Sequence, residues 1–237
     1  MDAQQQVAEA GARAARFQRI WMMTYVALFS ALLAFFVVLI TQVQLEGIAV
    51  KRAHQQLTQR LYLDVKAALR AQGMDWVRVE NDFPKGVRLY PAPALFAGAP
   101  LFAPGSDQLN PRFEPYLAAM GRLLRALDLA HFQRRYGLLV QQIENRGFRL
   151  RLTLRVEGHT ARRPLPADSP FSDAMTLSLY RADRVRQALQ RSSLLVDEYW
   201  AIAGYGALHP LFPNPADARN ERVELYLQPD MWEDTRP

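Results

Sequence analysis

An uninterrupted apolar run near the N-terminus constrains this chain more than any other feature. Residues 20–40 include no Asp, Glu, His, Lys or Arg. At about 1.5 Å of rise per residue, a helix over this run is about 31 Å long, sufficient to cross the hydrocarbon core of a bilayer. The run exceeds the roughly 7–15 apolar residues of a signal peptide, and no small-x-small cleavage motif follows it. We therefore predict an uncleaved transmembrane helix over residues 20–41.

The charges that flank this run predict its orientation. Three arginines stand directly before it, Arg13, Arg16 and Arg19. The first charged residue after it is Glu46, although Lys51 follows soon afterwards. Because loops rich in Lys and Arg remain in the cytoplasm, residues 1–19 are expected to form a cytoplasmic tail. The rest of the chain is then expected on the other side of the membrane.

Composition excludes several classes of function. The chain has 237 residues and no cysteine, which excludes disulfides, thiolate metal sites and a lipidated cysteine. Its net charge of +6 comes almost entirely from arginine, without the basic and aromatic motifs of nucleic-acid binding. The four histidines lack metal-ligand spacing, and no phosphate loop or nucleophile motif is present. We expect no catalytic residues, no metal, no cofactor and no nucleic-acid partner, and therefore no enzyme.

An amphipathic helix is predicted to connect the membrane span to the remainder of the chain. Apolar residues recur at spacings of three to four through Ala53, Leu57, Leu61 and Val65. This connector helix is expected over residues 42–73. Its apolar stripe requires a partner surface, which is either a second copy of the chain in a homodimer or the domain that follows.

Alternating strands and helices predict an α/β domain over residues 74–230, followed by a short tail, 231–237. Strands are expected at 76–80, 86–90, 148–157, 200–203 and 223–227. One helix is expected at 112–129, with a second turn or continuation to about residue 145, and another at 173–191. The proline-rich segment 91–111 is expected to be an ordered loop. The prediction is a two-layer domain, a mixed β-sheet with helices packed on one face.

Five segments of this domain resemble the OmpA C-terminal family of peptidoglycan-binding domains. They are Leu101-Phe102-Ala103-Pro104-Gly105-Ser106, Val156-Glu157-Gly158-His159-Thr160, Leu177-Ser178-Leu179-Tyr180-Arg181-Ala182, Gly204-Tyr205-Gly206 and Asn220-Glu221-Arg222-Val223-Glu224. The family pattern has Gly-His-Thr-Asp at the second and Asn-Arg-Arg-Val-Glu at the last. The resemblance implies an OmpA-like fold and peptidoglycan as a partner. The candidate binding residues are Arg181, His159, Thr160, Leu177, Ser178, Asn220 and Arg222.

The candidate pocket departs from the family pattern at two positions. In the family, an Asp holds the ammonium of the peptide's diaminopimelate, and an Arg, here Arg181, holds a carboxylate. The Asp position is Ala161, and a family Asn is replaced by Ala174. Without the carboxylate, the ammonium loses a charge-assisted hydrogen bond. We therefore expect weak or altered peptidoglycan binding, unless Asp168 or Asp173 supplies the missing group.

The apolar helix resembles that of MotB, the flagellar stator subunit, through Trp21, Thr24, Tyr25, Leu28, Phe35 and Phe36. MotB joins such a helix to an OmpA-like domain and carries a proton-binding Asp at the position of Ala27. An ionisable group inside a membrane is costly and usually functional, and this helix has none. A stripe of small residues remains, Ala27, Ser30, Ala31 and Ala34, whose spacing favours close packing against a partner helix.

These observations predict a single-pass inner-membrane protein with a cytoplasmic N-terminus and an OmpA-like periplasmic domain. Its expected role is to tether a membrane complex to peptidoglycan or to an envelope partner. The first alternative is a MotB-like subunit of an ion-driven stator-type complex, with a MotA-like or other multi-helix partner that supplies the carboxylate. The second is a protein-binding module with a degenerate peptidoglycan pocket.

Overall fold

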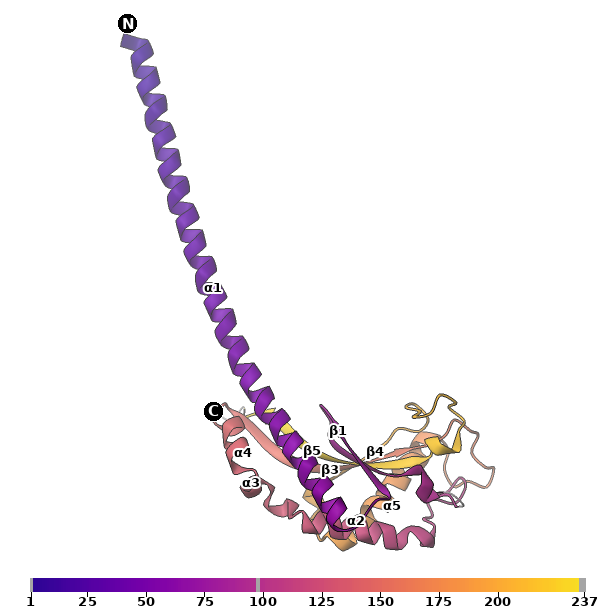
Figure 1. Cartoon of the computed structure of the whole chain (residues 1–237). Coiled ribbons are helices and arrows are strands. Elements are labelled where there is room, and N and C mark those ends of the chain that lie inside the picture. Colours follow the sequence, from indigo (N-terminus) through magenta and orange to yellow (C-terminus); the bar gives the residue numbers. More distant parts are fainter. Residues whose placement is uncertain (1, 97–98, 235–237) are drawn as a thin grey trace. The chain divides into compact units, whose positions relative to one another are not determined.

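The computed structural model describes the backbone of residues 2–96 and 99–234, and the side chains of residues 16–41, 49–96 and 99–234. The chain divides into two compact units, Met1–Val50 and Lys51–Pro237. Helix α1 (Asp2–Ala71) provides the first unit and the beginning of the second. The tail, span and connector that we expected as three segments therefore belong to one continuous helix (Figure 1).

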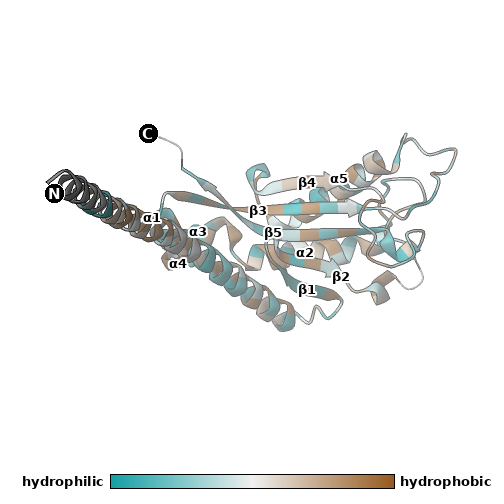
Figure 2. Ribbon diagram, turned by 90° about the horizontal axis from the view of Figure 1, so that it is seen from above, coloured by the Kyte–Doolittle hydropathy of each residue, from teal (hydrophilic) through white to brown (hydrophobic). Residues whose placement is uncertain are grey.

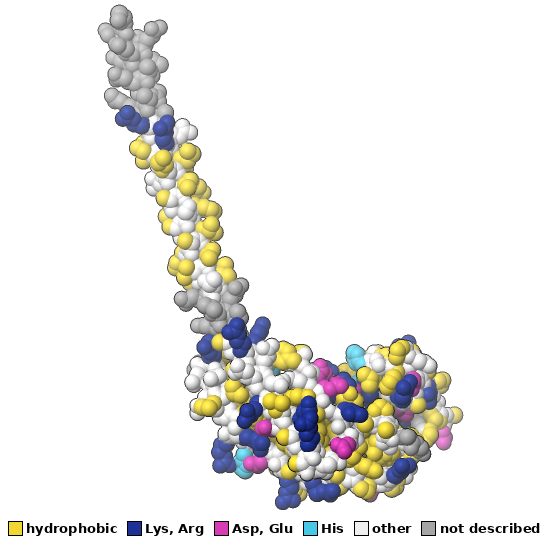
Figure 3. Space-filling model, viewed as in Figure 1, with side chains coloured by type: hydrophobic (Ala, Val, Ile, Leu, Met, Phe, Trp, Pro, Cys, Tyr) yellow, Lys and Arg dark blue, Asp and Glu magenta, His cyan; other side chains and the backbone are white. Residues whose placement is uncertain are grey.

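Among the described residues, the first unit contains one segment that is long and apolar enough to cross a membrane, Arg16–Thr41, and the most apolar 18-residue window of this segment has a mean hydropathy of 2.5. Both threonine hydroxyls of this segment bond to the helix backbone, since Thr24 Oγ1 donates to Ile20 O and Thr41 Oγ1 donates to Val37 O. Such bonds satisfy polar groups where water is absent. In Figure 3, this segment carries a continuous coat of apolar side chains beyond the arginines at its start.

A mixed sheet of five strands forms the centre of the second unit. The strands are β1 (Val77–Asp82), β2 (Gly86–Pro91), β3 (Phe148–His159), β4 (Trp200–Gly204) and β5 (Arg222–Glu233). Their order is β1-β2-β5-β3-β4, and only β3 and β4 run parallel. The sequence predicted all five strands, and the mixed sheet confirms the predicted fold class.

Helices cover one face of this sheet. The helices are α2 (Glu114–Ala126), α3 (Phe132–Arg135), α4 (Gly137–Glu144) and α5 (Ala174–Ser193), with 3-10 turns at Pro93–Phe96, Pro111–Phe113, Leu129–His131, Asp197–Tyr199 and Ala218–Asn220. Helix α5 packs on β3 and β4, and α2 packs beside α5 (Figures 1 and 2). Leu150, Leu152, Leu154 and Val156 are buried to at least 98%. The alternating apolar residues of β3 thus form the core, as period-two patterning predicts.

The apolar stripe of the connector packs on the domain. Leu57, Leu61 and Val65 are fully buried. Polar contacts hold the same segment, because Asp64 accepts hydrogen bonds from Arg135 Nη2 at 3.2 Å and from Tyr136 Oη at 2.8 Å. Of the two partner surfaces considered for the stripe, the structure shows the domain. A homodimer remains a prediction that this stripe does not require.

Strand β5 extends further toward the C-terminus than we expected. The predicted strand ended at residue 227, and the predicted domain ended at residue 230. It runs to Glu233, which pairs with Phe148 at the start of β3. The sequence pattern ends early because Pro229 cannot donate to the ladder and polar residues flank it. The length of β3 provides a partner for each of these residues, and Pro229 O is also bonded by His54 Nε2 at 2.7 Å.

Candidate functional site

The segments that carry the family resemblance meet where β3 and β4 approach the N-terminal half of α5. A Cβ atom on Gly158 would lie 2.0 Å from Ser178 O, and one on Gly204 would lie 2.6 Å from Leu179 N. Glycine is therefore required here because backbone approaches backbone. Ser178 Oγ completes the junction, since it donates to Met175 O and accepts from Gly206 N. Leu177 and Ser178 are buried, so both serve packing.

His159 ends β3 beneath an aromatic ring. Its ring stacks on Tyr205 at a centroid distance of 5.4 Å, and the residue is 96% buried. Burial, followed by the charge of Arg222, lowers the pKa of His159 to about 4. The imidazole is therefore neutral at neutral pH. Neither ring nitrogen has a hydrogen-bond partner among the described residues, and the neighbouring Thr160 joins the junction through its backbone N–H to Gly206 O at 2.9 Å.

Arg181 is bound by the protein itself. Its side chain is only 3% exposed, and the guanidinium lies over the Phe102 ring, 5.0 Å from the centroid. Nε donates to Ser106 O at 2.9 Å and Nη2 donates to Ala103 O at 3.2 Å. Nη1 donates to Glu221 Oε2 at 3.2 Å. We expected this guanidinium to bind a ligand carboxylate, but its Nη1 binds the carboxylate of Glu221 instead.

Asn220 and Arg222 also have structural contacts. Asn220 is fully buried, and its Oδ1 accepts from the backbone N–H groups of Leu211 and Phe212. Arg222 Nε donates to Glu224 Oε1 at 2.6 Å, and Arg222 Nη2 donates to His209 O. Both residues thereby hold the loop between β4 and β5 against the sheet.

The two acids considered as replacements for the carboxylate missing at Ala161 lie on the loop before α5 and at the N-cap of this helix. Ala161 is 4% exposed. Asp173 is the N-cap of α5, where its Oδ1 accepts from Thr176 N at 2.8 Å, and this hydrogen bond lowers the pKa of its carboxyl. Asp168 is exposed on the loop, and Ala174 begins α5. The structure therefore brings the seven candidate residues into one region, where Arg181 and Arg222 are paired with carboxylates of the chain.

One buried polar cluster on the uncovered face of the sheet has the residue types of a metal site. Ligand atoms of Glu157, His159 and Glu224 lie within 4.8 Å of one another. Cationic side chains already neutralise both carboxylates: Arg155 and Lys85 contact Glu157, and Arg222 and Arg88 contact Glu224. Burial opposes ionisation of Glu224, but Arg222 and Arg88 outweigh it and lower its pKa. Four positive groups around two carboxylates disfavour a divalent cation.

The small-residue stripe of the apolar helix lies on a separate unit. Ala27, Ser30, Ala31 and Ala34 are all exposed along Arg16–Thr41. This exposure is compatible with contact to lipid or to another helix, so the packing seam stays a prediction.

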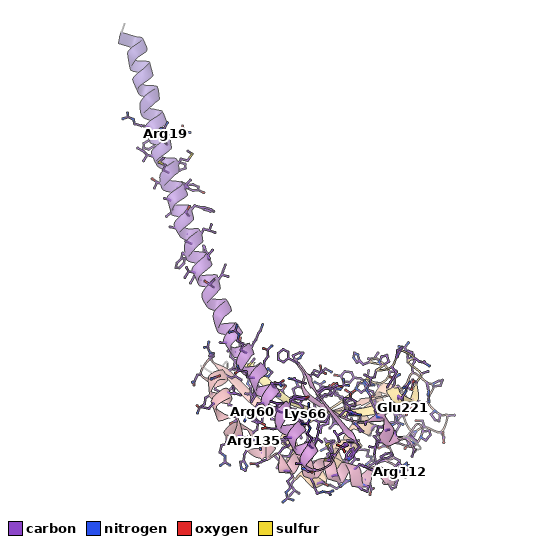
Figure 4. All side chains as sticks on the ribbon, in the orientation of Figure 1. Arg19, Arg60, Lys66, Arg112, Arg135 and Glu221 are labelled. Atoms are coloured by element: carbon purple, nitrogen blue, oxygen red, sulfur yellow. The ribbon has the colours of Figure 1, made fainter. Side chains whose placement is uncertain are left out.

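Sequence reasoning located the junction but missed the partner of Arg181. The available signal was Glu221, which replaces an Arg of the family's Asn-Arg-Arg-Val-Glu pattern with an acid. Its side chain is 35% exposed and lies at the end of the domain remote from Arg60 and Arg135 (Figure 4). Lys85 was also missed, because nothing in a turn sequence indicates that it reaches Glu157 in another strand.

Comparison with known proteins supports the fold. No family model and no curated protein matches the chain. A putative MotB-like protein from Desulfovibrio vulgaris has 23% identity and a TM-score of 0.53, and the match covers 76% of this chain and 95% of that one. The resemblance to MotB-like and OmpA-like domains is thereby confirmed at the level of the fold.

Two further solved structures are similar at lower scores. The periplasmic domain of Helicobacter pylori MotB has 22% identity and a TM-score of 0.45, over 65% of this chain and 82% of that one. The cell wall anchor of the T6SS from Pseudomonas aeruginosa has 20% identity and a TM-score of 0.48, over 70% of this chain and 97% of that one.

Proposed function

We propose that this chain is a single-pass inner-membrane protein whose domain lies in the periplasm and tethers a membrane complex to the cell wall or an envelope partner. The proposal depends on one observation: the same chain contains an apolar span, Arg16–Thr41, and a domain with the fold of a MotB-like protein. The arginines before the span support a cytoplasmic N-terminus. The work of such a protein is mechanical, and we propose no enzymatic activity.

Reporter fusions test the topology. A reporter enzyme that works only in the periplasm, fused after residue 60, should be active, and the same reporter fused after residue 10 should be inactive. The matched control is a reporter that works only in the cytoplasm, for which the two fusions should give the opposite pattern. Cytoplasmic activity of the fusion after residue 60 would show that the orientation is wrong.

Wall binding through Arg181 is expected to be weak. The guanidinium already binds Glu221, and Ala161 supplies no carboxylate for an ammonium group. Sedimentation of the full chain with purified sacculi measures the interaction. If wall carboxylates compete with Glu221, Glu221→Gln should increase the pelleted fraction. The control Glu198→Gln makes the same charge change in the exposed turn before β4 and should leave that fraction unchanged.

The same contact supports a second candidate function, a protein-binding module. The internal Arg181–Glu221 pair leaves the candidate pocket without a free cation or a free anion at its centre. If no variant pellets with sacculi, the wall-tether proposal fails and the protein-binding candidate is favoured. A stator-type role would need a membrane carboxylate from a partner, because residues 20–40 contain none.

A further inference from the structure

A groove of about 620 Å³ lies between residues 90–96 and 99–104 on one side and the loop that precedes β5 on the other. Its walls are mainly apolar and aromatic, with Tyr90, Phe96, Phe102, Leu211 and Phe212 among them. Pockets of roughly 300–1,000 Å³ that are lined by apolar side chains with a few polar groups are typical ligand sites. The size and walls of this groove therefore suit a ligand with an apolar body.

Charged groups stand at the margin of the groove, and most of them are neutralised within the chain. Arg219 donates to both carboxylate oxygens of Asp217, and its Cζ lies 4.0 Å from the centroid of the Phe212 ring. Arg222 is paired with Glu224. Glu221, which also lines the groove, is paired with the buried Arg181. These pairs leave no net charge for a ligand to neutralise.

Arg163 is different from the other arginines of the groove. It is exposed, and its Nε donates to Ala216 O at 2.6 Å, which orients the guanidinium. Among the described residues, its two terminal nitrogens form no hydrogen bond or ion pair. A guanidinium with both terminal nitrogens free can bind a carboxylate through two parallel hydrogen bonds. The hydrogen bonds from Arg219, and to a smaller extent the charge of Arg163, lower the pKa of the Asp217 carboxyl, so two arginines share one carboxylate. The groove thus has one positive charge in excess beside an apolar surface.

We propose that this groove binds an apolar polypeptide segment of an envelope protein that bears a single carboxylate, and that Arg163 holds this carboxylate. Aromatic walls favour proline and other apolar side chains of an extended peptide. A ligand with several anionic groups is disfavoured, because Arg163 and Arg219 together exceed Asp217 by one positive charge and Glu221 repels further negative charge. The inference goes beyond wall tethering, and the experiment for it does not use sacculi.

Calorimetric titration of the full chain in lipid nanodiscs tests the proposal. The probe is an acetylated pentapeptide of proline, leucine and phenylalanine with a free C-terminal carboxylate, and its C-terminal amide is the comparison. A hydrogen bond to a charged group corresponds to roughly a ten- to hundredfold change in affinity. We therefore expect the acid to bind at least tenfold more tightly than the amide, and Arg163→Gln to abolish this preference.

Two variants control for unspecific effects. Arg162→Gln removes the same charge from the adjacent exposed residue, which does not line the groove, and should keep the preference for the acid. Leu211→Gln changes the apolar wall and should weaken both peptides equally. The proposal is wrong if acid and amide bind equally, if neither binds at millimolar concentration, or if Arg162→Gln acts like Arg163→Gln. It is also overturned if only anionic lipid vesicles or peptidoglycan fragments bind in an Arg163-dependent manner.

Discussion

Replacement of Glu221 by alanine tests whether Arg181 depends on a carboxylate of its own chain. The change removes the 3.2 Å contact to Nη1 but leaves the bonds of the guanidinium to Ser106 O and Ala103 O. A hydrogen bond between charged groups contributes about 1.5–3 kcal/mol. Because the Glu221 side chain is 35% exposed, water replaces part of this contact. We therefore expect the free energy of unfolding to fall by about 1–2 kcal/mol.

The Arg181→Ala variant should be affected more strongly. It removes all three hydrogen bonds and the contact with Phe102, and Ser106 O loses its guanidinium donor while Ala103 O still accepts from Ser106 N. We expect a loss of about 3–5 kcal/mol. The double variant should lose little more than Arg181→Ala alone, because Glu221 then has no partner to lose. Such non-additivity identifies a direct interaction.

Urea unfolding of the full chain in detergent, followed by tryptophan fluorescence, measures these differences. The control is His131→Ala, which removes the 2.8 Å hydrogen bond between His131 Nδ1 and Asp128 Oδ1, whose side chains are 51% and 58% exposed. Exposed pairs contribute about 1 kcal/mol or less, so this control should change stability less than Glu221→Ala. Equal losses in the two variants, or additive losses in the double variant, would refute the reasoning.

Three further predictions concern the junction and the span. The pKa of His159 is about 4 in the folded protein and about 6.5 in the unfolded chain, so the unfolded chain binds protons more readily. The free energy of unfolding should therefore fall by up to about 3 kcal/mol as pH drops from 6.5 to 4. Urea titrations that show a pH-independent difference between the protein and His159→Phe would contradict this. Gly158→Ala should lower the free energy of unfolding by about 3 kcal/mol or more, because the new Cβ meets Ser178 O. In the control Gly137→Ala, in helix α4, the new Cβ meets no atom within 4 Å, so thermal unfolding should show a neutral or stabilising effect. Ala31→Leu should disrupt association of the apolar helix more than Leu32→Ala in a membrane crosslinking assay, and equal effects would count against the seam.

Periodicity in the sequence was sufficient to predict most of the fold. The strict alternation of Leu150, Leu152, Leu154 and Val156 predicted both the strand and its buried face, because a half-covered sheet requires that pattern. The end of β5 was not predictable in this way. Its last residues, around Pro229, pair because β3 is long enough to receive them, and this is a property of another part of the chain.

The candidate site was predictable by position but not by role. The sequence indicated that Arg181 and Asn220 would lie near each other, and the structure places them in one region. Their partners are backbone carbonyl and N–H groups and the acid Glu221. A backbone partner cannot be recognised from residue identity, because every residue type other than proline has the same backbone groups. A sequence pattern therefore locates a polar residue more readily than it shows whether a ligand or the protein itself satisfies that residue.

The contacts of Arg181 also bear on the order of folding. The guanidinium joins residues that are 75, 78 and 40 positions away along the chain, Ser106, Ala103 and Glu221. Contacts between such distant segments form only after large loops have closed, and the entropy of closure must be lost first. We infer that these bonds are among the last to form. Substitutions of Arg181 should therefore accelerate unfolding while they leave the rate of folding almost unchanged.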